Sequence, residues 1–284
     1  QFLEENRGSF DGVILCLPNF GDENGASVAL KNANVPVLVQ AYPDKIGEMD
    51  FAHRRDAMCG KFAMCNLLRQ AGIPYTLTEK FVVEPLSDSF RNDLVNFAGV
   101  CRIVKGMKHF NLGAIGARTT AFKTVRVDEI AFQKKGINIE TIDLSDIFAR
   151  VAKVPQARID EKKVQILNIT EFSGYPEEKL CTMAKVQAVF EDIVSEYNLQ
   201  AVAVRCWNEF ETVLGIAPCT SLCLLNELGI SAACEVDITN AVMMRALSLA
   251  SDSPCMLLDY NNNYGESDDK AIMFHCGPIP PSML

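Results

Sequence analysis

Short apolar runs alternate with longer amphipathic stretches along most of the chain. Residues 35–40 and 200–205 are strand-sized apolar runs, whereas residues 177–196 repeat apolar positions at the three- and four-residue spacing of a helix. Strands that alternate with helices are typical of α/β domains built on a parallel sheet. The same pattern predicts further strands over 12–17, 110–115, 137–142, 230–234, 255–259 and 271–275, and further helices over 25–33, 56–72, 89–106, 124–135, 144–154, 218–228 and 238–249.

The order of these elements predicts two Rossmann-like α/β domains with parallel sheets, followed by the start of a C-terminal β-rich domain. We place the first domain at residues 1–107, because helix 89–106 completes it and a new strand opens at residue 110. The second domain then spans 108–233, and the C-terminal part spans 234–284. Residues 165–171 carry no clear pattern, and the asparagine-rich residues 261–265 are expected to form a loop.

Composition and charge exclude several classes of protein. The 284 residues are 49% apolar and 22% charged, which suits globular cores and excludes a disordered or fibrous chain. The net charge is −9 and no run of five basic residues occurs, so neither nucleic acid nor a membrane surface is expected as a partner. No apolar run is long enough to span a bilayer.

The eleven cysteines indicate reduced thiols rather than a disulfide scaffold. Their number is odd, the chain is long, and most lie among apolar neighbours, as Cys16 and Cys65 do. We therefore expect a cytoplasmic protein. The chain starts without methionine and stops soon after strand 271–275, so we also expect it to be part of a longer protein.

A turn that contains glycine follows the predicted strand 110–115, where ligands of α/β domains bind. Gly113 and Gly116 lie three residues apart, which is not the G-x-G-x-x-G spacing of a dinucleotide-binding loop. A nucleotide-binding loop and an ordinary strand-to-helix turn both stay open as interpretations. Arg118 is accordingly either a ligand clamp or a solvated charge.

Polar groups at three other strand ends suggest a metal site. Trp207 and Glu209 follow strand 200–205, Asp237 follows strand 230–234, and His275 ends strand 271–275. Two carboxylates and one imidazole suit a hard divalent cation that keeps open positions for a substrate.

Two ambiguities accompany this metal site. Glu235 and Asp237 point to opposite faces if the segment is extended, so one of them faces the site, and Asp237 also suits the N-cap of the helix that follows. A zinc site at Cys219 and Cys223 is a weaker rival, because this pair lies one turn apart on an apolar helix.

Several segments, taken in order, resemble the L-fucose/L-arabinose isomerase superfamily, and more closely its fucose-isomerase-like branch. Residues 10–15 and 36–40 look like the strands of the family's first domain, and residues 110–118 and 127–137 look like a loop and helix of its second domain. The metal-binding segments of the family are similar to residues 205–210, 234–237 and 274–277. The resemblance runs from about residue 10 to residue 277.

This resemblance implies a metal-dependent aldose–ketose isomerase that acts on a pentose or a 6-deoxyhexose through an ene-diol. It implies Mn²⁺, or another divalent cation, held by Glu209, Asp237 and His275. The two carboxylates would also carry the proton, with Glu235 in reserve. Arg118 and Trp207 would contact the sugar.

The resemblance also implies a homo-oligomer, a trimer or hexamer. Residues 49–51 and 56–60 are similar to the segment that reaches a neighbouring subunit's active site in arabinose isomerases. Asp56 and Cys59 would then contact the substrate, although the family has Gln and His at these two positions.

Two other functions fit the same residues. A sugar-binding or regulatory protein on this scaffold would bind sugar without turnover, and the replaced residues at positions 56 and 59 favour it. A nucleotide-dependent enzyme would use the loop at residues 113–118.

Overall fold

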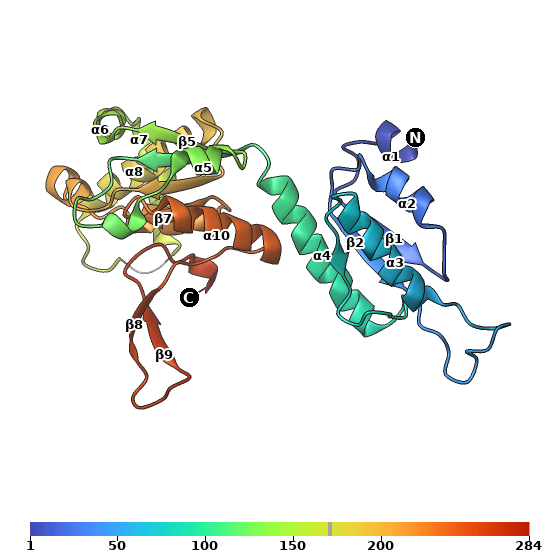
Figure 1. The fold of residues 1–284 in the computed structure, drawn as a ribbon. Coiled ribbons are helices and arrows are strands. Elements are labelled where there is room, and N and C mark those ends of the chain that lie inside the picture. Colours follow the sequence, from blue (N-terminus) through green and yellow to red (C-terminus); the bar gives the residue numbers. More distant parts are fainter. Residues whose placement is uncertain (170–171, 284) are drawn as a thin grey trace. The chain divides into compact units, whose positions relative to one another are not determined.

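The computed structural model describes residues 1–169 and 172–283, and the chain divides into two compact units (Figure 1). Unit 1 comprises Gln1–Lys105 and unit 2 comprises Gly106–Leu284. Each unit has its own parallel sheet, which confirms the predicted α/β class with two parallel-sheet domains. The predicted further division at residue 234 stays a prediction.

Unit 1 is built on a three-stranded parallel sheet of order β1-β2-β3. The strands are β1 (Val13–Leu17), β2 (Val37–Ala41) and β3 (Thr76–Leu77), and the helices are α1 (Phe2–Glu5), α2 (Glu23–Leu30), α3 (Ala57–Gln70) and α4 (Asp88–Gly106).

Alternation along β2 explains how helices cover both faces of this sheet. Val37 and Val39 pack with α2 and α3, whereas Leu38 packs with Phe90 and Phe97 of α4. Successive side chains of a strand point to opposite faces, so a strand buried on both faces is apolar throughout.

The core of unit 1 also contains a buried lysine. The Lys61 side chain is fully buried, and its Nζ donates hydrogen bonds to Thr78 Oγ1 at 2.8 Å and to the Phe81 carbonyl at 2.7 Å. Burial lowers the pKa of Lys61 to about 8, partly opposed by the negative potential of Cys65 and Asp93. Met58 and Phe62 of the same helix are exposed.

Unit 2 is built on a four-stranded parallel sheet of order β5-β4-β6-β7. These strands are β4 (Phe110–Ile115), β5 (Ile137–Ile142), β6 (Ala201–Val204) and β7 (Ser231–Cys234). The α-helices are α5 (Glu129–Gln133), α6 (Leu144–Val151), α7 (Gln156–Leu167), α8 (Glu177–Glu196), α9 (Cys219–Glu227) and α10 (Ile238–Ser251), and an antiparallel pair, β8 (Asp259–Asn263) and β9 (Ala271–Phe274), follows. Short helical turns lie at Lys123–Val125, Phe210–Leu214 and Pro281–Met283.

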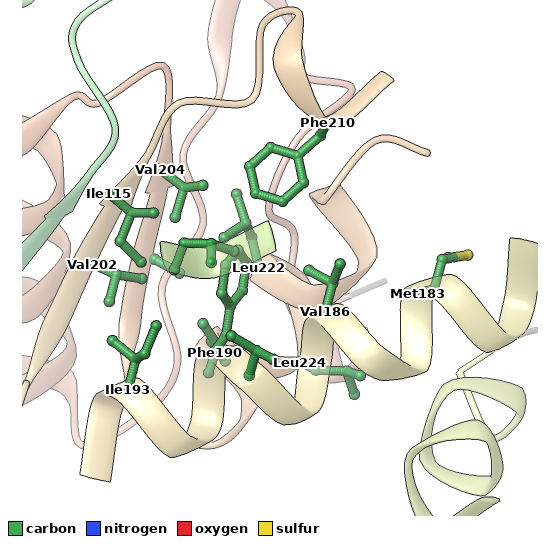
Figure 2. Close-up of a cluster of buried hydrophobic side chains, with 14 of the residues drawn as sticks. Ile115, Met183, Val186, Phe190, Ile193, Val202, Val204, Phe210, Leu222 and Leu224 are labelled. Atoms are coloured by element: carbon green, nitrogen blue, oxygen red, sulfur yellow. The ribbon is translucent and has the colours of Figure 1, made fainter. Parts of the chain in front are cut away.

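Side chains of β6 enter two different cores. Val202 and Val204 belong to the larger core, against α8 and α9 (Figure 2). In this core the rings of Phe190 and Phe210 pack edge to face, with their centroids 6.0 Å apart. Ala201 and Ala203 join the second core, under α10. The alanines of β6 thus face α10, and its valines face α8 and α9 on the other side of the sheet.

Several predicted elements match the structure closely. The strands at 110–115 and 137–142 and the helix at 177–196 have the predicted bounds. The expected helix at 124–135 is wrong in extent, since only a short turn and α5 form there. Among the described residues, no helix is long and apolar enough to cross a membrane.

Two segments were wrongly predicted because few of their residues are buried, so their sequences show little apolar periodicity. The helix α7 was not expected, since only Ile159, Lys162 and Ile166 of its twelve residues are buried. The strand β8 lies where a loop was expected, because every residue of β8 is exposed and shows no apolar alternation. Of the unpatterned residues 165–171, positions 170–171 lie outside the described residues.

The stability of unit 1 should rise with pH above about 8. The pKa of Lys61 is about 8 in the folded protein, whereas a lysine in an unfolded chain has a pKa of about 10.4. Between these two pH values the unfolded state binds more protons than the folded state, so raising the pH favours folding. We expect the free energy of unfolding to increase by on the order of 3 kcal/mol across this window.

Urea titrations followed by circular dichroism measure this change, and Trp207 fluorescence marks the unfolding of unit 2. Lys61→Met should remove the rise, whereas Lys80→Met, at an exposed position, should retain it. An equal rise in Lys61→Met would contradict the assignment.

Candidate active site at the sheet edge of unit 2

The carboxyl ends of β4, β6 and β7 meet at one edge of the sheet. The strands are parallel and in register, with Ile115 beside Val204 and Val204 beside Cys234. The Arg205 N–H donates to the Ile115 carbonyl, and the Val236 N–H donates to the Val204 carbonyl, so the segments after the strands stay side by side. Nearly all predicted polar residues of unit 2 therefore lie at this edge.

The turn after β4 is shaped by Gly116. Its φ is +85°, and a Cβ at this position would come within 2.9 Å of the Arg205 Cβ. Gly113 lies inside the strand and packs against Leu199, so the two glycines do not share one loop. Glycine is used here for a left-handed turn and for close packing.

Arg118 stabilises its own turn. Its guanidinium donates to the carbonyls of Thr119 at 2.9 Å and Phe122 at 3.1 Å, and the side chain is half-buried. The ring centroids of Phe122 and Trp207 lie 5.2 Å apart, and Trp207 is 48% exposed. The predicted sugar contacts Arg118 and Trp207 thus lie on neighbouring segments of the same edge, and their role stays a prediction.

Arg205 connects the turn after β4 with the segment after β6. It donates to the Ala117 carbonyl at 3.1 Å, to the Trp207 carbonyl at 3.0 Å, and to both carboxylate oxygens of Glu209 at 2.6 Å. Burial opposes ionisation of Glu209, but the hydrogen bonds from Arg205 outweigh it and lower the pKa of Glu209. Glu209 is therefore an ionised carboxylate whose oxygens are both occupied by Arg205.

Asp237 caps helix α10. One carboxylate oxygen accepts the Asn240 N–H at 3.0 Å and the other accepts the Asn240 side-chain amide at 2.6 Å. Sequence reasoning had left open a cap or a ligand at this position, and the cap is formed.

Glu235 is held in a different environment. Its φ is +60° and that of Val236 is +58°, so the segment is not extended and the expected alternation with Asp237 does not apply. Burial and the negative charge of Asp259 raise the pKa of Glu235, whereas His275 lowers it in part. Within the described chain this carboxylate has no hydrogen-bond partner.

His275 is oriented by its backbone neighbour. Its Nδ1 lies 2.9 Å from the Leu257 carbonyl, which only accepts, so Nδ1 carries the proton. In the neutral ring, Nε2 is then the acceptor, and it lies 3.3 Å from Cys234 Sγ. The imidazole therefore lies between Cys234 of β7 and the segment before β8.

The three predicted metal ligands are not gathered in this arrangement. Glu209 is hydrogen-bonded to Arg205 and Asp237 to Asn240, while His275 bonds the Leu257 carbonyl through Nδ1 and contacts Cys234 through Nε2. In the part of the chain that the structure describes, no three His, Cys, Asp or Glu side chains are placed to hold one metal ion. The residue types suit a divalent cation, but their geometry here does not fit one.

Cysteines surround this edge; sequence reasoning assigned most of the chain's cysteines to packing and kept a zinc site at Cys219 and Cys223 as a weaker rival. Cys206 and Cys234 are buried, and a hydrogen bond between the two thiols lowers the pKa of Cys206. The same contact, together with burial, raises the pKa of Cys234. Cys219 and Cys223 of α9 also lie close by, and Cys223 Sγ lies 3.7 Å from the Gly277 carbonyl.

Two predicted site residues belong to unit 1. Asp56 pairs with Arg54 at 2.9 Å and Cys59 is an exposed thiol on α3. Unit 1 also has a mostly apolar cavity of about 410 Å³, lined by Val35, Tyr75, Val104 and others, and no carboxylate lines it. That cavity lacks the acid–base groups found at the edge of unit 2.

Replacing Arg205 should loosen the segment around Trp207. Arg205→Lys keeps the charge but loses the bidentate contact, so we expect the free energy of unfolding to fall by about 1–2 kcal/mol and acrylamide quenching of Trp207 to increase. Arg126→Lys, which alters an exposed arginine bonded to its own turn, should change neither. Unchanged quenching in Arg205→Lys would show that Arg205 does not hold this segment.

Comparison with known proteins supports the resemblance noted from the sequence. Residues 3–108 match a family model described as the N-terminal domain of fucose/sulfoquinovose isomerase. The chain is 26% identical to a sulfoquinovose isomerase of Alkalicoccus urumqiensis, and 23% identical to one of Priestia aryabhattai. Each alignment covers 97% of this chain and 61% of the relative.

A third similar protein is a sulfoquinovose isomerase of a Clostridium species, strain MSTE9. It is 20% identical, and the alignment covers 81% of this chain and 51% of the relative. The chain thus spans about three-fifths of the length of the first two relatives. Residues 3–108 are thus similar to the N-terminal domain of the fucose/sulfoquinovose isomerases, and nearly the whole chain is similar to proteins named sulfoquinovose isomerase.

Proposed function

We propose that this protein takes part in aldose–ketose isomerisation of a sugar, with the carboxyl edge of the unit 2 sheet as the reaction site. The observation that carries the proposal is the placement of Glu209, Glu235, Asp237 and His275 at the ends of neighbouring elements there. The relatives are named sulfoquinovose isomerases, which makes this sugar the first substrate to test. The pentose or 6-deoxyhexose that the resemblance implies stays a prediction and is tested beside it.

The reaction moves a proton between C1 and C2 of the sugar, and among these carboxylates Glu235 suits that role best. Burial raises the pKa of Glu235 above that of an ordinary carboxyl, which makes it a better proton acceptor. Glu209 and Asp237 are already occupied by Arg205 and Asn240. Their assignment as catalytic groups stays a prediction from the resemblance.

The account predicts exchange of the sugar C2 hydrogen with solvent. In D₂O the protein should introduce deuterium at C2 of sulfoquinovose, of a 6-deoxyhexose or of a pentose, and release the ketose, as followed by NMR. Glu235→Gln should lower the rate about 100-fold or more. Glu266→Gln, in the exposed loop between β8 and β9, should have no effect.

The alternative is a protein that binds sugar without turnover. A sugar that raises the melting temperature but shows neither exchange nor ketose would favour this alternative and would contradict the isomerase proposal. If Glu235→Gln exchanges the C2 hydrogen at the full rate, the isomerase proposal stands but Glu235 is not the proton carrier.

We also propose Mn²⁺, or another divalent cation, as cofactor, on the basis of the resemblance and the donor types. Such an ion would supply electrophilic stabilisation of the sugar oxygens. A bound ion would share the oxygens of Glu209 with Arg205 and those of Asp237 with Asn240, because each of these oxygens already accepts a hydrogen bond.

Mn²⁺ at about 100 times its dissociation constant should stabilise the fold by about 2–3 kcal/mol. Asp237→Asn should abolish this gain. Asparagine is as good an N-cap as aspartate, so the variant should fold normally without metal. Glu235→Gln should keep most of the gain, and thermal unfolding with and without Mn²⁺ measures both. An equal gain in Asp237→Asn would exclude Asp237 as a ligand.

We propose, again from the resemblance, that the protein is a homo-oligomer. Unit 1 exposes large apolar side chains on and next to α3, which a neighbouring copy could cover: Ile46, Met49, Phe51, Met58 and Phe62.

A further inference from the structure

His275 follows a hairpin that gives its side chain no support. All residues of β8 and β9 are exposed, so the hairpin belongs to neither core of unit 2. The imidazole is half-buried, with Nδ1 2.9 Å from the Leu257 carbonyl and Nε2 3.3 Å from Cys234 Sγ. The placement of the ring therefore depends on the residues that flank the hairpin.

Helix α9 holds the chain directly after His275. The side-chain amide of Asn226 donates to the Pro278 carbonyl at 3.4 Å, and Cys223 Sγ lies 3.7 Å from the Gly277 carbonyl. Gly277 and Pro278 are buried, in contrast to the hairpin before them. The turn at residues 277–278 is thus attached to the helix, and His275 lies two residues from this attachment.

Asn226 also connects the helix with the sheet. Its side chain is 3% exposed, and Nδ2 donates to the carbonyls of Leu222 and Ala232, both at 3.0 Å. Oδ1 accepts the Ala232 N–H at 2.9 Å. Ala232 belongs to β7, the strand that ends at Cys234. Because a buried amide is costly without its partners, these bonds fix α9, β7 and the turn at Pro278 together.

Gly277 leaves the space that the imidazole occupies. A Cβ at this position would come within 2.5 Å of His275 Nε2 and within 2.8 Å of two carbon atoms of the ring. The φ of Gly277 lies outside the left-handed region, so the backbone itself does not require glycine here. Since the ring is bonded to Leu257 and lies against Cys234, it cannot make room for a methyl group without leaving its place.

We propose that Asn226 and Gly277 are positioning residues that hold the His275 imidazole at the reaction edge of unit 2. Asn226 anchors the turn to α9 and β7, and Gly277 lets the turn pass the ring without displacing it. Both residues act through His275 rather than on the sugar. The proposal rests on the proposed function, because it assigns the two residues to the reaction at this edge.

The test compares Gly277→Ala with Gly25→Ala. Gly25 lies on α2 with open space around it, and its φ is also outside the left-handed region. NMR of the ¹⁵N-labelled protein detects the Nδ1–H of His275, because an N–H bonded to a carbonyl is protected from exchange with water. The chain has three histidines, and the signal is assigned by its loss in His275→Gln. We expect the signal in the wild type and in Gly25→Ala, and its loss in Gly277→Ala.

Two further measurements extend the test. Asn226→Ala should also lose the Nδ1–H signal, because the turn is then released from α9 and β7; if this variant does not fold, Gly277→Ala decides alone. The kcat for sugar isomerisation should fall about 10-fold or more in Gly277→Ala, with a smaller change in KM, because a displaced group no longer meets the substrate in the productive geometry. Gly25→Ala should keep the wild-type kcat.

An unchanged Nδ1–H signal in Gly277→Ala, or the absence of this signal in the wild type, would overturn the proposal. A lost signal with an unchanged kcat would also overturn it, because the ring would then move without any effect on the reaction. If the wild type converts no sugar, the proposed function fails, and the NMR signal alone decides whether Asn226 and Gly277 hold the ring.

Discussion

The arrangement of the candidate site depends on the contacts of Arg205. Its guanidinium occupies both oxygens of Glu209 and two backbone carbonyls, Ala117 and Trp207, from segments that follow different strands. Bidentate pairs of arginine and carboxylate are stronger and more directional than single hydrogen bonds. The turn after β4 and the segment after β6 are therefore held in one geometry, and Glu209 is kept ionised.

The sheet beneath allows these segments to meet. Four parallel strands in register bring their carboxyl ends to one edge, and helices on both faces bury the strands. Parallel α/β sheets bind ligands at this edge because chain direction, rather than any single residue, collects the loops there. A polar residue that directly follows a strand, as Arg205 follows β6 and Glu235 follows β7, is therefore placed at this edge.

Much of this could be predicted from the sequence, since burial leaves periodic patterns. The four strands of the unit 2 sheet and helix α8 followed from apolar runs and helical spacing, and most of the candidate polar residues do lie at one edge of that sheet, as the motifs at strand ends indicated. Partners could not be predicted in the same way. That Arg205 occupies Glu209, and that Glu235 rather than Asp237 lacks a hydrogen bond, depends on backbone angles at positions 235 and 236 that no spacing reveals. Lys61 shows the same limit, because a lysine at a core position of α3 contradicts the apolar pattern until its partners Thr78 and Phe81 are known.

The central claim is that sugar reacts at the unit 2 edge, beside Glu235. A crystal structure of the protein with a bound aldose tests it most directly. The account predicts the C1 and C2 atoms of the sugar within hydrogen-bond reach of the Glu235 carboxylate, with His275 and Trp207 close by. An aldose bound in the apolar cavity of unit 1, with the edge of unit 2 free of sugar, would contradict it.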